Sequence, residues 1–311
     1  MAPLDEESAR LSRQAIALVE RELHAEALAC LDAVLAGWDG DMEVHNTRGR
    51  AQLGLGQIEA AGVSFALARE RDPGADAPVI NLGLVLEMQG RRDEALAEFD
   101  AALARWPGHR EVARRRAILL GKRGRPMAAL AALQGLLAAW PDDLGILVDR
   151  GNAQLAVEQF AGALSSYDQA LAMAPRNADA HYNRGIALQA LERHVEAVAA
   201  YEQALAIAPD MTAALINRAN SLRRLIRHTE AMADYRRVLE LRPGNAMALG
   251  NLGKTLGEIG RRAEALDYLD QAILADPAIP ETRWMRVTAT IPAIRYADDD
   301  LPALRAEFGA A

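Results

Sequence analysis

Residues 178–209 read ADAHYNRGIALQALERHVEAVAAYEQALAIAP, and four of their side chains set the spacing that decides the fold. Gly185 is followed twelve residues later by Ala197, and Tyr201 comes four residues after that alanine. Pro209 closes the stretch twelve residues after Ala197. The small residues let two helices approach to roughly 8–10 Å, and the proline cannot continue a helix. The stretch therefore predicts a pair of closely packed helices that ends at the proline.

The same spacing recurs along nearly the whole chain with a period of 34 residues. The prolines are Pro73, Pro107, Pro141, Pro175, Pro209, Pro243 and Pro277. The alanines twelve residues before them are Ala61, Ala95, Ala129, Ala163, Ala197, Ala231 and Ala265. The small residues twelve further upstream are Gly49, Gly83, Ala117, Gly151, Gly185, Ala219 and Gly253. The large residues four after the alanines are Phe65, Phe99, Leu133, Tyr167, Tyr201, Tyr235 and Leu269. A degenerate first copy has Ala15, Ala27 and Leu31 in register, with Asp39 in place of the proline.

This pattern resembles the tetratricopeptide repeat, a unit of two antiparallel helices. The resemblance implies an all-α fold, a right-handed α-solenoid of about eight helical hairpins with capping helices at the C-terminal end. In this register residues 1–7 lead in, and residues 8–279 form eight units. These units start at residues 8, 42, 76, 110, 144, 178, 212 and 246. Because Pro292 breaks the pattern, we expect residues 280–311 to cap the open end of the solenoid. Positions within a unit are numbered from these starts.

Composition and charge exclude several classes of protein. The formal net charge is −8 over 311 residues, which argues against a general nucleic-acid binder. No apolar run approaches the length of a membrane span, and the N-terminal sequence lacks the pattern of a signal peptide. The single cysteine, Cys30, allows no intrachain disulfide and fits a reducing compartment. The sequence therefore predicts a cytoplasmic protein that binds neither nucleic acid nor membrane.

Catalytic and metal-binding patterns are not found. The stretch GNLGKT, Gly250–Thr255, imitates a phosphate-binding loop, but Ala248 stands where that motif needs its first glycine. The six histidines form no pair four residues apart, so we expect no metal site. We interpret His45 and His181, both at position 4, as partly buried helix contacts. We therefore predict a chain that is no enzyme and holds no cofactor.

Asparagine, a weak helix former, recurs at position 6 of the first helix. In a stacked helical-hairpin superhelix the first helices line the concave surface, with positions 2, 5, 6, 9 and 13 facing the groove. A carboxamide can both donate to and accept from a peptide main chain, whatever the bound sequence. The alternative is a solvated helix face. Thr47, Arg115 and Asp149 interrupt the row at position 6. The candidate peptide-binding residues are Asn81, Asn183, Asn217, Asn251, Asn152, Asn220, Lys254, Tyr182, Arg114 and Arg115.

One repeat is basic inside an acidic protein. Residues 109–126, HREVARRRAILLGKRGRP, hold six arginines and one lysine. Arg114 and Arg115 face the groove in the assumed register, so an acidic segment could dock there. The alternative is a solvated helix whose charges form salt bridges. Arginine also recurs at position 7, where we expect the stems to pack between repeats and the heads to reach carboxylates.

A narrower resemblance concerns the asparagine row, the HYNRGIAL style of repeat and the tail RWMRVTATIPAIRYADDD. These look like the repeat arm of bacterial SPINDLY-type O-linked N-acetylglucosamine transferases, and the tail carries Arg283, Trp284, Ile291, Pro292 and Tyr296. The resemblance implies an arm that presents protein substrates to a fused or partner glycosyltransferase, because these residues hold no catalytic region.

Two other classes stay open beside this interpretation. One is a free-standing assembly scaffold, which could associate with itself through exposed repeat ends. The other is a co-chaperone adaptor that clamps a C-terminal carboxylate. The best window for that clamp has Val148, Ala213 and Asn217 where basic residues are needed. The partner is in every case a protein or an extended peptide segment.

Overall fold

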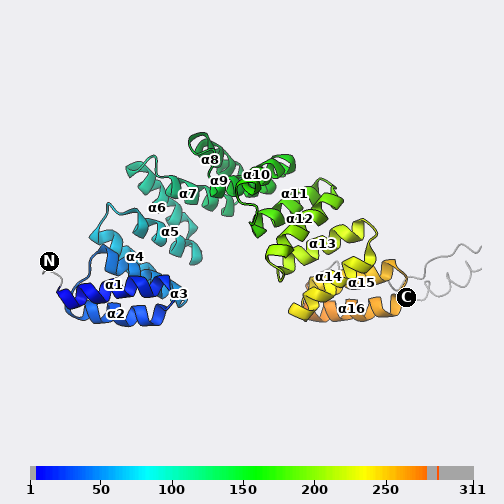
Figure 1. Cartoon of the computed structure of the whole chain (residues 1–311), viewed down its shortest axis with the longest axis horizontal. Helices are drawn as coiled ribbons and strands as arrows, with labels where there is room; N and C mark the ends of the chain where they lie inside the picture. Colours follow the sequence, from blue (N-terminus) through cyan, green and yellow to red (C-terminus); the bar gives the residue numbers. More distant parts are fainter. Residues whose placement is uncertain (1–4, 279–285, 287–311) are drawn as a thin grey trace, which may run out of the picture. The chain divides into compact units, whose positions relative to one another are not determined.

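The computed structural model describes residues 5–278 and residue 286, and within them every regular element is an α-helix (Figure 1). The all-α solenoid of helical hairpins predicted from the sequence is confirmed. The helices are α1 (Glu6–Glu20), α2 (His24–Gly37), α3 (Met42–Gly54), α4 (Ile58–Arg71), α5 (Asp76–Met88), α6 (Arg92–Arg105), α7 (Arg110–Lys122), α8 (Pro126–Ala139), α9 (Leu144–Ala156), α10 (Phe160–Met173), α11 (Ala178–Ala190), α12 (His194–Ile207), α13 (Thr212–Arg224), α14 (His228–Leu241), α15 (Ala246–Glu258) and α16 (Arg262–Ala275). Odd-numbered helices are the first helices of their repeats, and even-numbered helices are the second. Apart from Arg286, the capping segment expected at residues 280–311 lies outside the described residues.

Four first helices begin after an aspartate or asparagine at position 34 of the preceding repeat, whereas α5 and α13 have Ala75 and Met211 there. Asp41, Asp143, Asn177 and Asn245 each accept a hydrogen bond from the amide three residues further on, at 2.9–3.0 Å. Such side chains satisfy amides that have no partner inside the helix. The local sequence therefore fixes where these four first helices start.

The turn between paired helices has the same backbone conformation in every repeat. Position 15 has a positive φ in all eight copies. Four of these residues are glycine: Gly56, Gly90, Gly124 and Gly260. The other four are Glu22, Glu158, Glu192 and Ile226. Glycine adopts this conformation without strain, whereas a β-branched residue such as isoleucine is unfavourable there.

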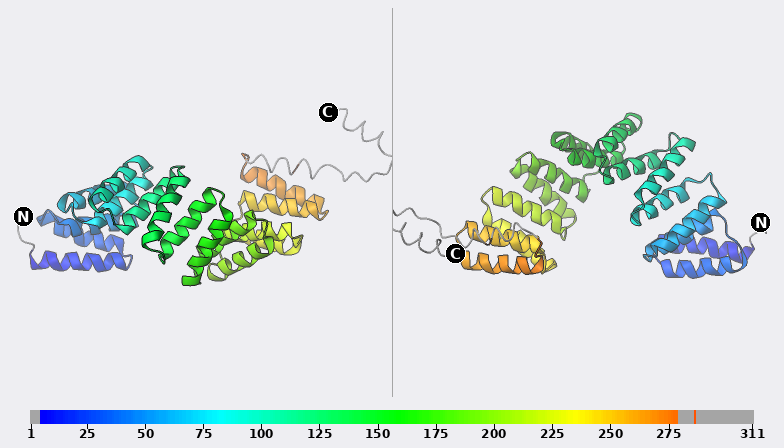
Figure 2. Two further views of the ribbon diagram at one scale, coloured as in Figure 1. Left: turned by 90° about the horizontal axis from the view of Figure 1, so that it is seen from above. Right: turned by 180° about the vertical axis from the view of Figure 1, so that it is seen from behind.

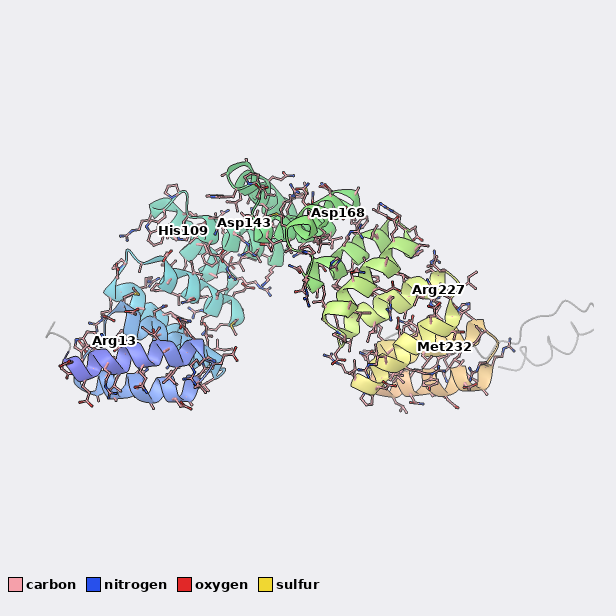
Figure 3. The ribbon with its side chains drawn as sticks, viewed as in Figure 1. Arg13, His109, Asp143, Asp168, Arg227 and Met232 are labelled. Carbon is pink, nitrogen blue, oxygen red and sulfur yellow. The ribbon has the colours of Figure 1, made fainter. Side chains whose placement is uncertain are left out.

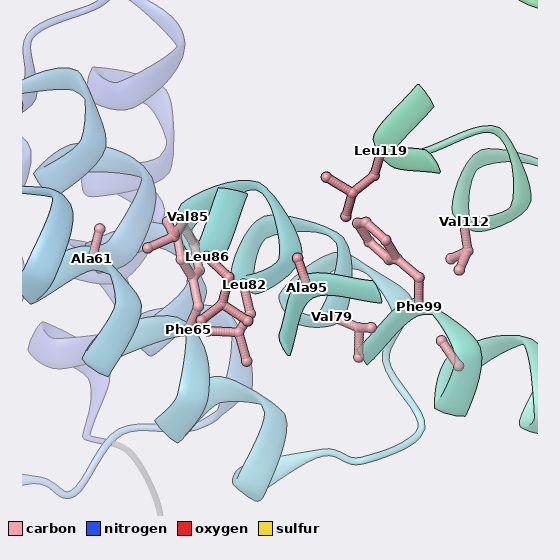
Figure 4. Packing of buried hydrophobic residues seen from close by; sticks show 11 residues of the cluster. Ala61, Phe65, Val79, Leu82, Val85, Leu86, Ala95, Phe99, Val112 and Leu119 are labelled. Atoms are coloured by element: carbon pink, nitrogen blue, oxygen red, sulfur yellow. The ribbon is translucent and has the colours of Figure 1, made fainter. Parts of the chain in front are cut away.

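The core of each repeat is built on the small residues of the period. The ring at position 24 lies directly on the glycine at position 8, because a Cβ added at Gly49, Gly83, Gly151 or Gly185 would come within 2.4–2.5 Å of that ring. The alanines at position 20 and the large residues at position 24 are at most 2% exposed. Figure 4 shows Phe99 beside Val112 and Leu119 of the following first helix. The second helix therefore packs both on its own partner and on the next repeat.

The chain divides into two compact units. The first ends at Met173 and holds α1–α10, and the second begins at Ala174 and holds α11–α16. Within each unit, every first helix contacts the first helix of the next repeat (Figure 2). Within each unit's described helices, the backbones of successive second helices are further apart, although Arg69 of α4 still forms an ion pair with Glu98 of α6. The first helices are thus the more closely spaced layer.

Candidate functional site on the first helices

The predicted binding residues lie on the closely spaced layer formed by the first helices. Asn152 is exposed, and the other nine candidates are half-buried, so none belongs to the apolar core. Lys254 is within α15, and the stretch Gly250–Thr255 that imitates a phosphate loop is helical throughout. These side chains are therefore accessible to another chain that lies against the first helices.

Position 5 of one first helix is bonded to position 6 of the next. The amide of Asn81 donates to Asn46 Oδ1 at 2.9 Å, and the amide of Asn217 donates to Tyr182 Oη at 3.2 Å. In the basic repeat Arg114 Nε donates to Asp149 Oδ2 at 2.6 Å. Each pair is 35 residues apart, one more than the period. We name these contacts the inter-repeat rungs.

The rungs orient the asparagine carboxamides. When Nδ2 donates to the neighbouring repeat, the amide plane is held and Oδ1 remains an acceptor directed away from that bond. Asn251 follows Ile216 at position 5, which has no polar side chain to form such a rung. The sequence analysis missed Asn46, although a polar residue 35 positions before an asparagine is a signal that could have identified it.

The asparagines at position 9 serve the core as well as the surface. Asn152 Oδ1 accepts from Tyr167 Oη, and Asn220 Oδ1 accepts from Tyr235 Oη, both at 2.7 Å. Both tyrosines are fully buried, and burial raises the pKa of Tyr235 to about 12. A buried hydroxyl without a partner is costly. These two asparagines therefore satisfy an interior donor, and their carboxamide oxygens are engaged.

The basic repeat is neutralised by its neighbours. Six of its seven basic side chains form ion pairs, five of them with another repeat or with the N-cap residue of α9. The pairs are Arg110–Asp143, Arg114–Asp149, Arg115–Glu111, Arg116–Asp100, Lys122–Glu87 and Arg123–Asp93. Figure 3 labels Asp143 and the N-cap residue of α7, His109. Burial raises the pKa of Asp149, against the opposing charge of Arg114. The salt-bridged interpretation of this repeat thus agrees with the geometry.

Arginines at position 7 pair with carboxylates either of the preceding repeat or of their own repeat. Arg48 pairs with Asp32 of the preceding repeat at 2.9 Å, whereas Arg218 holds Asp234 of its own repeat through two bonds of 2.6 and 2.8 Å. Arg150 donates to Ser166 instead. These contacts are structural, and they lie at the junctions between helices.

The histidines of position 4 also serve structure. His45 Nε2 bonds to the carbonyl of Asp39 at 2.8 Å, and His181 Nε2 bonds to that of Pro175 at 2.9 Å. In the part of the chain that the structure describes, no three histidine, cysteine or carboxylate side chains gather as a metal site would require. The described helices likewise include none that is both long and apolar enough to cross a membrane.

Comparison with known proteins agrees with this geometry. The chain matches the tetratricopeptide-repeat family over residues 12–76, 80–143, 148–212, 196–246 and 216–281. No curated protein matches it.

Similar solved structures share the fold at low identity. A tetratricopeptide repeat protein from Parabacteroides merdae is 19% identical with a TM-score of 0.60, covering 80% of this chain and 99% of its own. PilF of Pseudomonas aeruginosa is 19% identical with a TM-score of 0.59, covering 68% and 96%. The Cut9–Hcn1 hetero-tetramer is 14% identical with a TM-score of 0.67, covering 94% of this chain and 57% of that one.

Proposed function

The chain belongs to the tetratricopeptide-repeat family, and on that premise we propose that its first-helix face binds an extended segment of a partner protein. The family assignment supports a protein–protein interaction module. The proposal goes further, because it assigns the contact to the carboxamides at position 6. What carries it is the orientation of Asn81 and Asn217 by the inter-repeat rungs.

An oriented carboxamide binds main chain better than a free one. Holding the amide plane in advance removes part of the ordering cost of binding. Oδ1 of Asn217 then accepts from a backbone N–H of the bound segment, and each such bond contributes about 0.5–1.5 kcal/mol. Because main-chain groups are the same in every residue, this contact accepts many sequences.

The test replaces the three asparagines of the second unit with alanine. The probe is a peptide selected on the wild-type chain from a random dodecapeptide display library, with affinity measured by fluorescence anisotropy. Three lost bonds predict a weakening of at least about tenfold. The control is Gln203→Ala, which removes an exposed carboxamide from α12. If Asn183, Asn217 and Asn251 can all be replaced with unchanged affinity, the proposal is wrong.

A second variant tests the orientation itself. Tyr182→Phe removes the hydroxyl that accepts from Asn217 and leaves the ring that packs near Tyr201. We expect weaker peptide binding with an unchanged thermal transition. The control is Ile216→Val at the same position of the next repeat. It changes no polar contact of Asn251, so peptide affinity should stay unchanged.

The narrower assignment to a glycosyltransferase arm rests on the sequence resemblance alone. Its tail residues, Arg283, Trp284, Ile291, Pro292 and Tyr296, lie outside the described residues. Cytoplasmic location and self-association likewise remain predictions. Light scattering over a range of concentrations tests the scaffold alternative, since a self-associating scaffold gains mass with concentration whereas a peptide-binding monomer does not.

A further inference from the structure

A cavity of about 220 Å³ lies among α7, α8 and α9 of the first unit. Its walls are mostly apolar and include Ile118 of α7, Leu133 of α8, and Ala153 and Ala156 of α9. The polar residues that line it are Lys122, Asp149 and Asn152, which lie on first helices. The cavity therefore adjoins the face to which the proposed function assigns peptide binding.

The cavity arises from two departures from the repeat pattern. Leu133 stands at position 24, where five other repeats place an aromatic ring. Ile118 stands at position 9, where Asn152 and Asn220 meet a tyrosine hydroxyl in their own repeats. The smaller leucine leaves space that the ring occupies elsewhere, and Gly121 beside it has no side chain to fill that space.

The polar lining is already balanced in charge. Asp149 is paired with Arg114, and the Lys122 amine is paired with Glu87. A carboxylate entering here would face Asp149, and an ammonium would have to displace an existing pair. An uncharged apolar group meets neither cost. The surroundings thus favour a neutral side chain from a segment that is not acidic at this point.

We propose that this cavity is the anchor subsite for one large aliphatic or aromatic side chain of the bound segment. The proposal rests on the proposed function of the first-helix face. Apolar cavities of about 150 Å³ bind benzene, so this one can hold a leucine- or phenylalanine-sized group. The anchor supplies what main-chain bonds to asparagine cannot, a preference for particular sequences.

The first experiment tests the cavity without any peptide. Benzene is titrated into the full chain with methyl groups of Ile118 and Leu133 labelled for NMR. We expect saturable shifts of these methyls in the wild type, and none in Ala156→Leu. Ala156 is exposed at the end of α9, so the leucine fills the cavity from its open side. Absence of shifts in the wild type would overturn the anchor, while peptide binding elsewhere on the face could still stand.

The second experiment tests use of the cavity by peptide. Dodecapeptides selected on the wild type should share one large apolar residue and bind at least tenfold more weakly to Ala156→Leu. Ala199→Leu, at an exposed alanine on the second helix α12, is the control and should leave affinity unchanged. Bound peptides with no apolar preference, or with equal affinity for both variants, would overturn the anchor alone. If no peptide is selected at all, the proposed function is wrong, and the anchor role is wrong with it even if benzene shifts the methyl signals.

Discussion

Two substitutions in the turns between paired helices, Ile226→Gly and Gly260→Ile, should change the free energy of unfolding in opposite directions. Ile226 has a φ of 62° and is 77% exposed, so its side chain gives little packing in return for an unfavourable backbone conformation. Gly260 occupies the same position of the next repeat with a φ of 82°, and a Cβ there would meet no atom within 4 Å. Both lie in the second unit, so each is measured against the same background.

The magnitude follows from the backbone alone. A left-handed conformation costs an L-residue about 1–2 kcal/mol relative to glycine. Glycine also gains entropy in the unfolded chain, which offsets about 0.4–1 kcal/mol of that difference. We therefore expect Ile226→Gly to raise the free energy of unfolding by about 0.5–1 kcal/mol. Gly260→Ile should lower it by a similar amount.

The assay is urea unfolding followed by far-UV circular dichroism, with the midpoint and the slope recorded for both variants. An unchanged slope shows that the unfolding reaction is the same. A neutral or destabilised Ile226→Gly variant with an unchanged slope would refute the reasoning, because it would mean that the exposed isoleucine makes contacts worth more than its strain.

Three further predictions concern the core. Gly185→Ala should destabilise the chain, because the new Cβ would come within 2.4 Å of the Tyr201 ring. Gly257→Ala should be neutral or stabilising, because its Cβ would meet only the Ala265 methyl at 3.9 Å. Thermal unfolding of the two variants measures the difference. Ala197→Leu should cost about 1–3 kcal/mol through overpacking, measured by urea unfolding. Since burial raises the pKa of Tyr235 to about 12, the unfolded state releases this proton first as pH rises, so stability should fall from about pH 10 upward and less steeply in Tyr235→Phe.

The 34-residue period was sufficient to predict the helices and the core. The small residue at position 8 and the ring at position 24 specify one close contact in each repeat, and Gly185 with Tyr201 makes it as expected. Close packing leaves few alternatives at such positions, so residue size alone predicts the outcome.

Polar partners and cavities could not be predicted in the same way. Whether the exposed Asn152 also accepts a hydrogen bond from Tyr167 depends on side-chain rotamers, which periodicity does not specify. The rung between Asn46 and Asn81 depends on how far one repeat rotates against the next. The space beside Leu133 comes from two small departures, Leu133 on α8 and Ile118 on α7, and neither of them alone breaks the pattern.

The uneven spacing of the two helical layers has a mechanical consequence. Within each unit, the backbones of successive first helices lie close together along the array, while those of the described second helices are further apart. Bending that spreads the second-helix side separates half-buried side-chain pairs such as Arg69–Glu98, whereas bending the other way stretches the inter-repeat rungs. Because spreading the second-helix side increases the curvature toward the first helices, we expect each unit to tighten more easily than it opens. Such a unit closes around a narrow bound segment more readily than it admits a wide one.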